Sequence, residues 1–439
     1  RIVAILNINQ QPSNKNNTTL LLLEAMFALS RTFARLSVKR GFSTATRAPT
    51  ATGAAIVDPV IGLTDDQAEI YQLARGFADN ELKPYASKWD DDHYFPIDTY
   101  LKFGELGFAG IMVKEDVGGT ALSRLDNVNI IEALATGCVG TTAMLSIHNM
   151  CAGMIDKFGN DEQRQHYLPK MCKLELKASY CLTEPGSGSD AGSLSTKAVF
   201  DPSTNEYVIN GGKQFISGAG MSDIYLVMCR TSDKPGPKGI SCLIIPKEAK
   251  GVSFGAMEKK MGWHCQPTRQ VLFEDVRIPA TNRIGAEGDG FKFAMAGLDG
   301  GRLSIAACSI GAAQACFEIA VQYVKERKQF GKPIGDYQAT QFKLADMAGK
   351  ITTARLVVRN AAKLLDEGHP AATAHCALAK KIATDQGFEV CNEALQLHGG
   401  YGYLKDYQIE RYVRDCRVHQ ILEGTNEIMR HVVGRAVVA

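Results

Sequence analysis

The sequence lacks the marks of several large protein classes. Its 49 Lys and Arg nearly balance its 47 Asp and Glu and form no long basic run, so we expect no nucleic-acid partner. No apolar run approaches the roughly 18 residues of a membrane span, so we expect a soluble protein with no membrane span. The 12 cysteines occur singly, without C-x-x-C pairs or clustering near histidines. We therefore expect buried, reduced thiols, with neither a disulfide framework nor a metal site.

The N-terminal region lacks acidic residues. Between Glu24 and Asp58 there is no Asp or Glu, whereas basic residues alternate with Ser, Thr and apolar positions. This composition is typical of a mitochondrial transit peptide, which we expect at about residues 26–42 of an N-terminal extension covering residues 1–62. The mature chain would then begin near Ser43, and residues 1–25 match neither a transit peptide nor a domain. The alternative is a disordered basic tail without a targeting role.

Apolar periodicity divides the rest of the 439-residue chain into three regions. Residues 63–177 follow a helical pattern that starts after a predicted N-cap at Thr64. Residues 178–290 change to a period of two, with β-branched and aromatic runs separated by turn residues. The helical pattern returns over residues 291–439, in stretches at 291–328, 337–367, 371–397 and 408–422. We predict an α+β protein with an N-terminal α-helical domain, a middle antiparallel β-barrel or sandwich and a C-terminal four-helix bundle.

One carboxylate stands out as a candidate base. Residues 421–430 read ILEGTNEIMR, so Glu423 lies between leucine-like residues and a glycine that opens a new helix. Apolar neighbours raise a carboxyl pKa toward neutrality, which suits abstraction of a weakly acidic C–H proton. The alternative is an exposed glutamate in a turn between helices.

A glycine-rich segment imitates a dinucleotide-binding motif. Residues 186–191, GSGSDA, fit a relaxed G-x-G-x-x-A pattern, but strand-like residues follow where that fold requires a helix. We therefore reject a dinucleotide fold and expect these glycines to let backbone amides approach a ligand closely. The alternative is a flexible surface turn.

Five segments, taken in their order along the chain, resemble the acyl-CoA dehydrogenase flavoprotein family. The resemblance runs from about Leu63 to the C-terminus. It implies the family's α, β, α domain order and FAD as cofactor. The segments are YCLTEPGSGSD at 180–190, NGGKQFISG at 210–218, ERKQFG at 326–331, QLHGGYG at 396–402, and residues 421–430.

The same resemblance implies which residues bind FAD. One group would lie along the flavin ring, a second would face the ring from the other side, and a third would grip the pyrophosphate and adenosine ends. A fourth would do so from a neighbouring subunit, and a fifth opens a helix whose amides suit an anion. By itself Arg327 is equally compatible with a plain helix-end charge. In order, the groups are Tyr180, Cys181, Leu182, Thr183, Gly188 and Ser189; Phe215, Ile216 and Ser217; Arg327, Gln329, Phe330 and Gln338; Gln396, Leu397, His398, Gly399 and Gly400; and Thr425, Asn426 and Glu427.

The reaction implied by the resemblance is the α,β-dehydrogenation of an acyl-CoA. Glu423 would take the α-proton while the β-hydrogen leaves as hydride to flavin N5, and the Glu423 amide would bond the thioester oxygen. One subdivision of the family carries its base at the position of Gly301, which has no side chain here, so Glu423 is the only candidate. The residues expected near the substrate are Ser189, Asp299, Gly300, Gly301, Arg302, Gly424 and Arg430.

Within the family the motifs are most similar to members that act on short branched-chain thioesters. Gly300 and Gly301 suggest a reason, since two missing side chains near the thioester would admit a methyl branch. Alternatives are a 2-methylbutanoyl-CoA or butyryl-CoA dehydrogenase, an acyl-CoA oxidase, and a non-catalytic assembly factor on the same fold. The resemblance also implies an electron-transfer flavoprotein partner, a homotetramer built as a dimer of dimers, and a place in the mitochondrial matrix.

Overall fold

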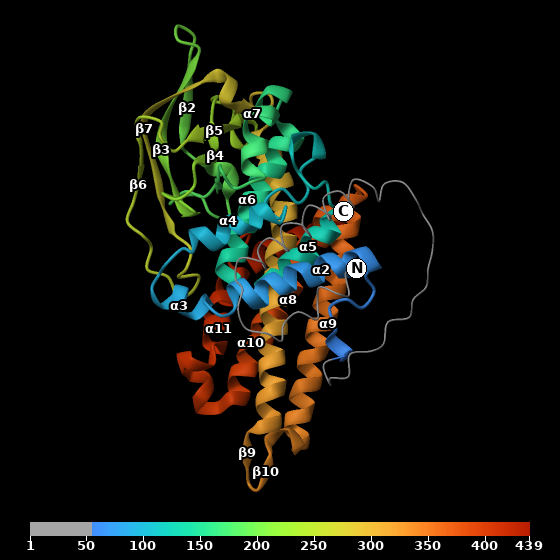
Figure 1. The fold of residues 1–439 in the computed structure, drawn as a ribbon. Coiled ribbons are helices and arrows are strands. Elements are labelled where there is room, and N and C mark those ends of the chain that lie inside the picture. Colours follow the sequence, from blue (N-terminus) through green and yellow to red (C-terminus); the bar gives the residue numbers. More distant parts are fainter. Residues whose placement is uncertain (1–54) are drawn as a thin grey trace. The chain divides into compact units, whose positions relative to one another are not determined.

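The computed structural model describes residues 55–439, so the predicted transit peptide lies outside the described part of the chain (Figure 1). The first long helix begins where the sequence predicts it. The Thr64 side chain accepts a hydrogen bond from the Gln67 amide, and the Gln67 side chain reaches back to the Thr64 amide, which completes a capping box. The N-terminal helices are α2 (Asp65–Phe77), the π-helical turn η2 (Ala78–Leu82), α3 (Ala86–Asp91), α4 (Ile97–Glu105), α5 (Arg124–Ala135), α6 (Val139–Phe158) and α7 (Asp161–Met171).

The middle region forms one eight-stranded sheet with the order β6-β7-β3-β2-β4-β5-β8 and with β1 beside β4. Its central strands, β4 and β5, are buried on both faces. Leu226 and Met228 pack toward the helices, whereas Tyr225 and Val227 share a core with Phe273 across the sheet. The sheet therefore encloses a core of its own, as a barrel or sandwich does. The strands are β1 (Ala178–Cys181), β2 (Lys197–Asp201), β3 (Glu206–Ser217), β4 (Ile224–Arg230), β5 (Ile240–Pro246), β6 (Val252–Phe254), β7 (Thr268–Pro279) and β8 (Arg283–Ile284).

The prediction that the sheet is antiparallel is wrong for two strand pairs. Strand β1 runs parallel to β4 along its whole length, and β2 meets β4 in parallel where Lys197 lies opposite Arg230. A parallel pair needs a long crossover, which is usually a helix and is then visible as a helical pattern. Here the crossover from β1 to β4 consists of a loop and the β2–β3 hairpin. The sequence pattern therefore contains no helical marker of the parallel pairing.

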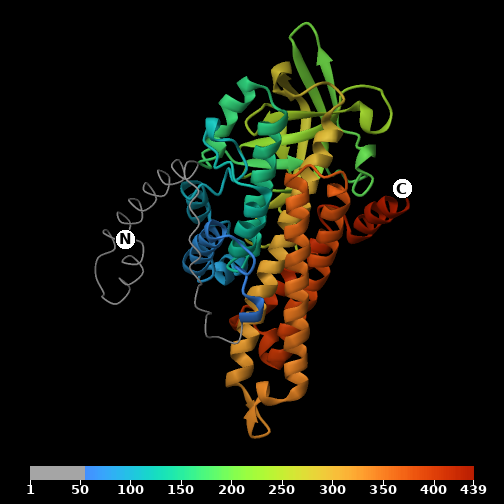
Figure 2. The same cartoon turned by 90° about the vertical axis from the view of Figure 1, so that its right-hand side faces the viewer.

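The C-terminal region contains three long helices that lie side by side in both views (Figures 1 and 2). The sheet lies near one end of α8, and the small β9–β10 hairpin lies at the other end of that helix (Figure 1). Many of their facing residues are small, such as Ala306, Ala361 and Ala383, which lets the helices approach closely. The elements are α8 (Gly290–Glu326), β9 (Lys328–Gln329), β10 (Lys332–Pro333), α9 (Gln338–Asp366), α10 (Ala372–His398), α11 (Ile409–Arg417) and α12 (Asn426–Val438).

The helix predicted over residues 408–422 is shorter than expected. Helix α11 ends at Arg417, and the 3-10 turn η10 (Val418–Gln420) follows it. A 3-10 turn continues nearly the same spacing of apolar residues, so periodicity alone did not reveal this end. Glu423 consequently lies between η10 and α12, outside both helices.

Helix α8 differs from the expectation that no segment resembles a membrane span. Among residues 55–439 it alone is long and apolar enough to cross a membrane, with a mean hydropathy of 1.5 over an 18-residue window. The window is apolar because it is rich in Ala and Ile, although polar residues interrupt it. Since 83% of this window is buried among other elements, α8 has the environment of a core helix.

All 12 cysteines are free and buried, as their scattered positions predict.

Candidate active site

The turn that carries Glu423 has an unusual backbone. Glu423 and Gly424 both adopt left-handed conformations, with φ of 56° and 88°. Glycine enters this region freely, but a glutamate does so at a cost of about 1 kcal/mol. After the turn, Thr425 caps α12 by accepting a hydrogen bond from the Ile428 amide. Strained residues of this kind are concentrated at functional sites.

The Glu423 carboxylate lies in a protected position. Its Oε2 atom is inaccessible to solvent and has no hydrogen-bond partner among the described residues. Burial raises the pKa of Glu423 to about 7, although the cationic side chains of Arg302 and Lys380 act in the opposite direction. The group is therefore poised to accept a proton near neutral pH, as expected of a general base.

Two glycines on α8 have roles different from the predicted one. A Cβ at Gly301 would lie 2.5 Å from Glu423 Oε2, and a Cβ at Gly300 would lie 2.7 Å from the Arg124 guanidinium. The space beside both glycines is thus already filled by side chains of the protein. The prediction that they make room for a methyl branch of the substrate is wrong, because the space beside Gly301 is taken by the Glu423 carboxylate.

Arg302 connects α8 to the turn. Its Nη1 atom pairs with Asp299 Oδ1 at 2.7 Å, and its Nε points at the Glu423 carbonyl oxygen at 3.4 Å. Asp299 is held in turn by the Thr373 hydroxyl at 2.7 Å. This chain of contacts fixes the Arg302 guanidinium beside Glu423.

A cavity of about 960 Å³ opens in front of Glu423. Its wall is formed by the sheet region, by α6 and α8, and by the segment from α11 to α12. Many predicted residues meet here although they come from two regions of the sequence, residues 178–290 and 291–439. Those lining the cavity are Tyr180, Leu182, Thr183, Gly188, Ser189, Phe215, Ile216, Ser217, Arg302, Glu423, Gly424 and Thr425.

A bulge in β3 presents Phe215 to this cavity. The register of β3 against β7 shifts between Lys213 and Ile216, and Phe215 takes a φ of 59° with its ring 64% exposed. The Gln214 amide donates to the Thr183 carbonyl oxygen at 2.8 Å and so joins this bulge to the loop after β1. Bulges commonly redirect side chains next to active sites.

A buried ion pair holds the loop after β1. Lys213 Nζ lies 2.7 Å from Glu184 Oε1 and also donates to the Leu182 carbonyl oxygen at 3.1 Å. Glu184 accepts further hydrogen bonds from the amides of Ser195 and Thr196. Burial acts to raise the pKa of Glu184, but Lys213 and these hydrogen bonds outweigh it and hold the pKa at about 2.

The glycine-rich loop is followed by a short 3-10 turn and then β2, which confirms that no dinucleotide-binding helix begins there.

Seven residues predicted around the flavin and the substrate do not line the cavity: Asp299, Gly300 and Gly301 on α8, and Cys181, Asn426, Glu427 and Arg430. The Cys181 side chain is buried in the core of the sheet. Asn426 is buried against α10, where its side chain bonds Lys380, Thr384 and Asp385. Glu427 and Arg430 are exposed and pair with each other at 3.1 Å.

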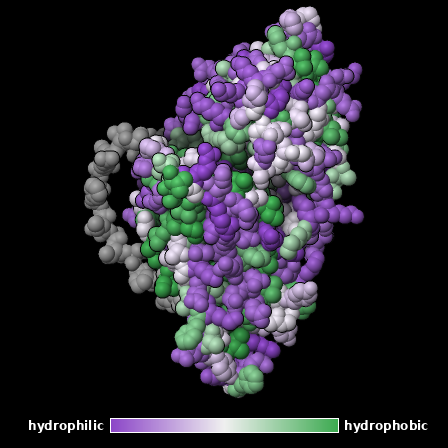
Figure 3. All heavy atoms as spheres, turned by 180° about the vertical axis from the view of Figure 1, so that it is seen from behind, coloured by the Kyte–Doolittle hydropathy of each residue, from purple (hydrophilic) through white to green (hydrophobic). Residues whose placement is uncertain are grey.

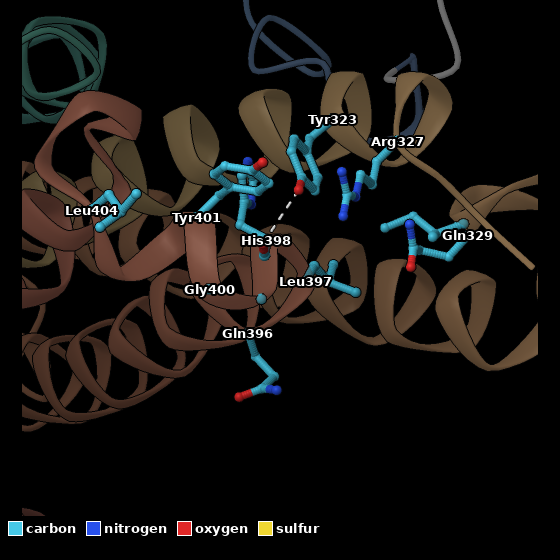
Figure 4. Close-up of a pocket in the computed structure, with 11 residues that line it drawn as sticks. Tyr323, Arg327, Gln329, Gln396, Leu397, His398, Gly400, Tyr401 and Leu404 are labelled. Atoms are coloured by element: carbon cyan, nitrogen blue, oxygen red, sulfur yellow. Dashed lines mark hydrogen bonds between the residues drawn. The ribbon is translucent and has the colours of Figure 1, made fainter.

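A second, separate cavity of about 520 Å³ is lined by most of the residues predicted to bind the pyrophosphate and adenosine ends of FAD, from the same subunit or from a neighbour. In Figure 4, Tyr323 and Arg327 project from the end of α8 toward His398 and Tyr401. The Tyr323 hydroxyl donates to the His398 carbonyl oxygen at 3.3 Å, and the Arg327 guanidinium lies over the Tyr401 ring. Phe330, 96% exposed, and Gln338 do not line it. The predicted residues lining it are Arg327, Gln329, Gln396, Leu397, His398, Gly399 and Gly400.

The large cavity fits a ligand with polar groups. Besides Glu423 Oε2, three polar atoms of its lining residues are buried without a hydrogen-bond partner in the described structure: the Tyr180 hydroxyl, Trp263 Nε1 and Gln266 Oε1. Buried polar groups normally have partners, so unpartnered groups beside a cavity indicate a ligand that supplies them. Together with the Phe215 ring, they suit a flat, polar-edged cofactor such as a flavin.

Sequence reasoning missed several residues of this site. Trp263 and Gln266 line the cavity, and Lys380 lies behind the turn with its ammonium on the Gly424 carbonyl oxygen at 2.7 Å. One signal for Lys380 was available. Together with Cys376 and Ala383 it falls on the apolar face of α10, where a lysine is unusual.

The chain matches the family models of acyl-CoA dehydrogenases over its N-terminal domain at residues 64–175, its middle domain at 179–276 and its C-terminal domain at 288–438. It is 55% identical over 380 residues to the mitochondrial isobutyryl-CoA dehydrogenase of Dictyostelium discoideum, which covers 87% of this chain and 91% of that protein. Its fold is similar to butyryl-CoA dehydrogenase from Megasphaera elsdenii, with a TM-score of 0.84, 37% identity, and coverage of 86% and 100%. A chain in a structure of the electron transferring flavoprotein of Acidaminococcus fermentans is also similar, with a TM-score of 0.84, 41% identity, and coverage of 86% and 99%.

Proposed function

Because the chain belongs to the acyl-CoA dehydrogenase family, an FAD-dependent oxidoreductase family, we propose that it converts isobutyryl-CoA to methacrylyl-CoA, a step in the breakdown of valine. One observation carries the proposed chemistry. Glu423 lines the large cavity, its Oε2 atom is inaccessible to solvent without a hydrogen-bond partner among the described residues, and its pKa is raised to about 7. The choice of isobutyryl-CoA is supported by the 55% identity to the Dictyostelium enzyme.

In the proposed reaction, the Glu423 carboxylate takes the proton from the α-carbon of the thioester. That proton becomes more acidic when negative charge on the thioester oxygen is stabilised. The Glu423 amide makes no hydrogen bond to another described residue, so it is available to donate one to that oxygen. Arg302 holds the turn from α8 and favours the ionised form of the base. Bound FAD supplies the acceptor for the hydride lost from the β-carbon.

We assign FAD binding to both cavities. Around the large cavity, Leu182, Thr183, Ser189, Phe215 and Ile216 would hold the flavin, beside the unpartnered polar groups. The residues of the second cavity, including Arg327, would hold the pyrophosphate and adenosine, because a guanidinium can bond a diphosphate in bidentate fashion.

The two cavities are separate within one chain, which favours an FAD site shared between two subunits. We propose that the second cavity of one subunit completes the large cavity of a neighbour, in a homotetramer built as a dimer of dimers. Exposed apolar side chains on the long helices, such as Phe342 at 60% and Leu356 at 62%, are consistent with burial in an assembly. Figure 3 shows further hydrophobic patches on a mainly hydrophilic face.

Two further proposals concern the cellular setting. The similarity to a chain in the A. fermentans structure supports an electron-transfer flavoprotein as the acceptor of the electrons. The mitochondrial relative and the basic N-terminal sequence support a place in the mitochondrial matrix. Import of the full chain into isolated mitochondria, followed by N-terminal sequencing of the product, tests the matrix location and the expected start near Ser43.

The substrate is tested by anaerobic titration of the purified flavoprotein with isobutyryl-CoA, butyryl-CoA and 2-methylbutanoyl-CoA. We expect isobutyryl-CoA to bleach the oxidised flavin band most efficiently, and Glu423→Gln to abolish bleaching while keeping the flavin. Preference for another thioester would replace the substrate and keep the reaction. Oxygen consumption without an added acceptor would indicate an oxidase, and a protein that binds no flavin would favour the assembly factor.

A further inference from the structure

Helix α10 carries a buried cation behind the turn of Glu423. Lys380 is 0% exposed, yet no carboxylate lies within ion-pair distance of it among the described residues. Its ammonium donates instead to two uncharged acceptors, the Gly424 carbonyl oxygen at 2.7 Å and Asn426 Oδ1 at 2.9 Å. An ammonium that is buried without a paired carboxylate is costly for stability. Such groups are candidates for a functional role.

The same face of α10 holds the turn on both sides of the base. Asp385 Oδ1 accepts a hydrogen bond from Gln420 Nε2 at 2.8 Å and another from Asn426 Nδ2 at 2.6 Å. Gln420 lies three residues before Glu423, and Asn426 lies three residues after it. Asn426 also donates to the Thr384 hydroxyl at 3.0 Å. One helix therefore fixes both ends of the segment that presents the base.

The backbone of that segment needs such support. Glu423 and Gly424 are consecutive left-handed residues, and a glutamate leaves this conformation readily unless its surroundings hold it there. Lys380 bonds the carbonyl oxygen that directly follows Glu423. Rotation of the turn would remove the only acceptors found for this buried ammonium in the described structure.

We propose that Lys380 is a positioning residue that holds the left-handed Glu423–Gly424 turn from α10 and supplies positive charge that keeps the carboxylate of Glu423 ready to accept a proton. The inference depends on the proposed function, because it takes Glu423 as the base. Lys380 does not line the cavity, so it would act through Glu423 without touching the substrate.

The sign of the charge effect follows from the groups around both residues. Glu423 is faced by Arg302 from α8, Lys380 from α10, Tyr180 from β1 and Cys151 from α6. Burial lowers the pKa of Lys380 to about 8, so the group is still mostly cationic at neutral pH. A nearby cation favours the carboxylate, and its loss must raise the pKa of Glu423. Besides Glu423, the charged or titratable groups that face Lys380 are Arg302, Asp385, Glu427 and His419.

The test is Lys380→Met in the holoenzyme, with kcat/KM measured against pH. We expect the acid limb of the pH profile, which should lie near pH 7 in the unaltered enzyme, to move to higher pH by roughly one unit. Activity at pH 7 then falls about fivefold beyond any loss that is independent of pH. Infrared difference spectra against Glu423→Gln report the protonation of this carboxyl without turnover, and its titration should move upward by the same amount.

Two more variants separate charge from position. Asn426→Ala removes the bridge to Asp385 but leaves the ammonium on the turn, so we expect a lower kcat at every pH and an unmoved acid limb. Lys350→Met is the matched control, because Lys350 pairs with Glu389 on α10, about 13 Å along the helix from Lys380, and should change neither quantity. An acid limb that stays in place in Lys380→Met would overturn the inference; if that variant does not fold, an unmoved acid limb in Lys380→Gln would do so. An active Glu423→Gln enzyme would instead overturn the proposed function.

Discussion

At the residue scale, Gly301 determines where the Glu423 carboxylate can lie. A Cβ at this position would come within 2.5 Å of Glu423 Oε2 and 2.8 Å of Glu423 Cδ. We therefore predict that Gly301→Ala displaces the carboxylate from α8 and lowers kcat about 100-fold, since displacement of a catalytic group by about 1 Å has effects of this size. Stopped-flow reduction of the flavin by the acyl-CoA measures the step directly.

The control for this variant is another helical glycine. A Cβ at Gly349 on α9 meets nothing within 4 Å, so Gly349→Ala should leave kcat unchanged and slightly raise the thermal midpoint through its better helix propensity. If Gly301→Ala reduced its flavin at the normal rate, the carboxylate would not depend on this contact.

Local sequence singled out Glu423 as a candidate base but did not show what surrounds it. Glu423 was identifiable because its apolar neighbours and the following helix lie within a few residues of it. Lys380 is 43 positions away in the sequence, and only the packing of α10 against the turn brings it to Gly424. The roles of Gly300 and Gly301 were misjudged for the same reason. The sequence shows that side chains are absent there but not which atoms occupy the space.

At the scale of elements, the Glu184–Lys213 ion pair joins β3 to the loop after β1. Both side chains are almost fully buried, at 3% and 0% exposure. We predict that Lys213→Met lowers the free energy of unfolding by about 3–5 kcal/mol, because it leaves a buried carboxylate without its cation. The loosened loop should also release flavin, so the ratio of flavin to protein after gel filtration falls. Urea denaturation measures the stability.

The double variant Lys213→Met with Glu184→Gln should regain much of this loss, since the amide is uncharged and its oxygen can still accept from the Ser195 amide. Lys88→Met breaks an exposed ion pair with Asp92 and should change stability little. Equal losses in Lys213→Met and Lys88→Met would show that burial of the pair does not matter.

The elements themselves were largely predictable, and the misses have one cause. Helix starts such as that of α2 follow from capping residues that lie next to the helix. The end of α11 and the direction of β1 leave no mark in the local pattern of apolar residues. Helix α11 gives way to a 3-10 turn whose spacing is almost helical, and β1 runs parallel to β4 because of a crossover without a helix.

At the scale of the whole molecule, the predicted FAD residues fall into two cavities of one chain. The motifs alone do not show this division, although the resemblance implies that residues 396–400 act from a neighbouring subunit. The proposed sharing of FAD gives the division a physical reason. It also makes cofactor binding and assembly depend on each other, since neither cavity alone holds the whole cofactor.

Sharing can be tested by mixing two inactive variants. Glu423→Gln disables the large cavity, and Gly400→Glu places a carboxylate in the second cavity, where we expect the cofactor's diphosphate. In a mixed dimer, one site receives both defects and the other receives neither. If subunits are reassembled at random from equal amounts, half of the dimers are mixed, so activity should recover to about a quarter of the unaltered enzyme. A site formed within one chain would leave the mixture as inactive as its components, because every chain then carries one defect.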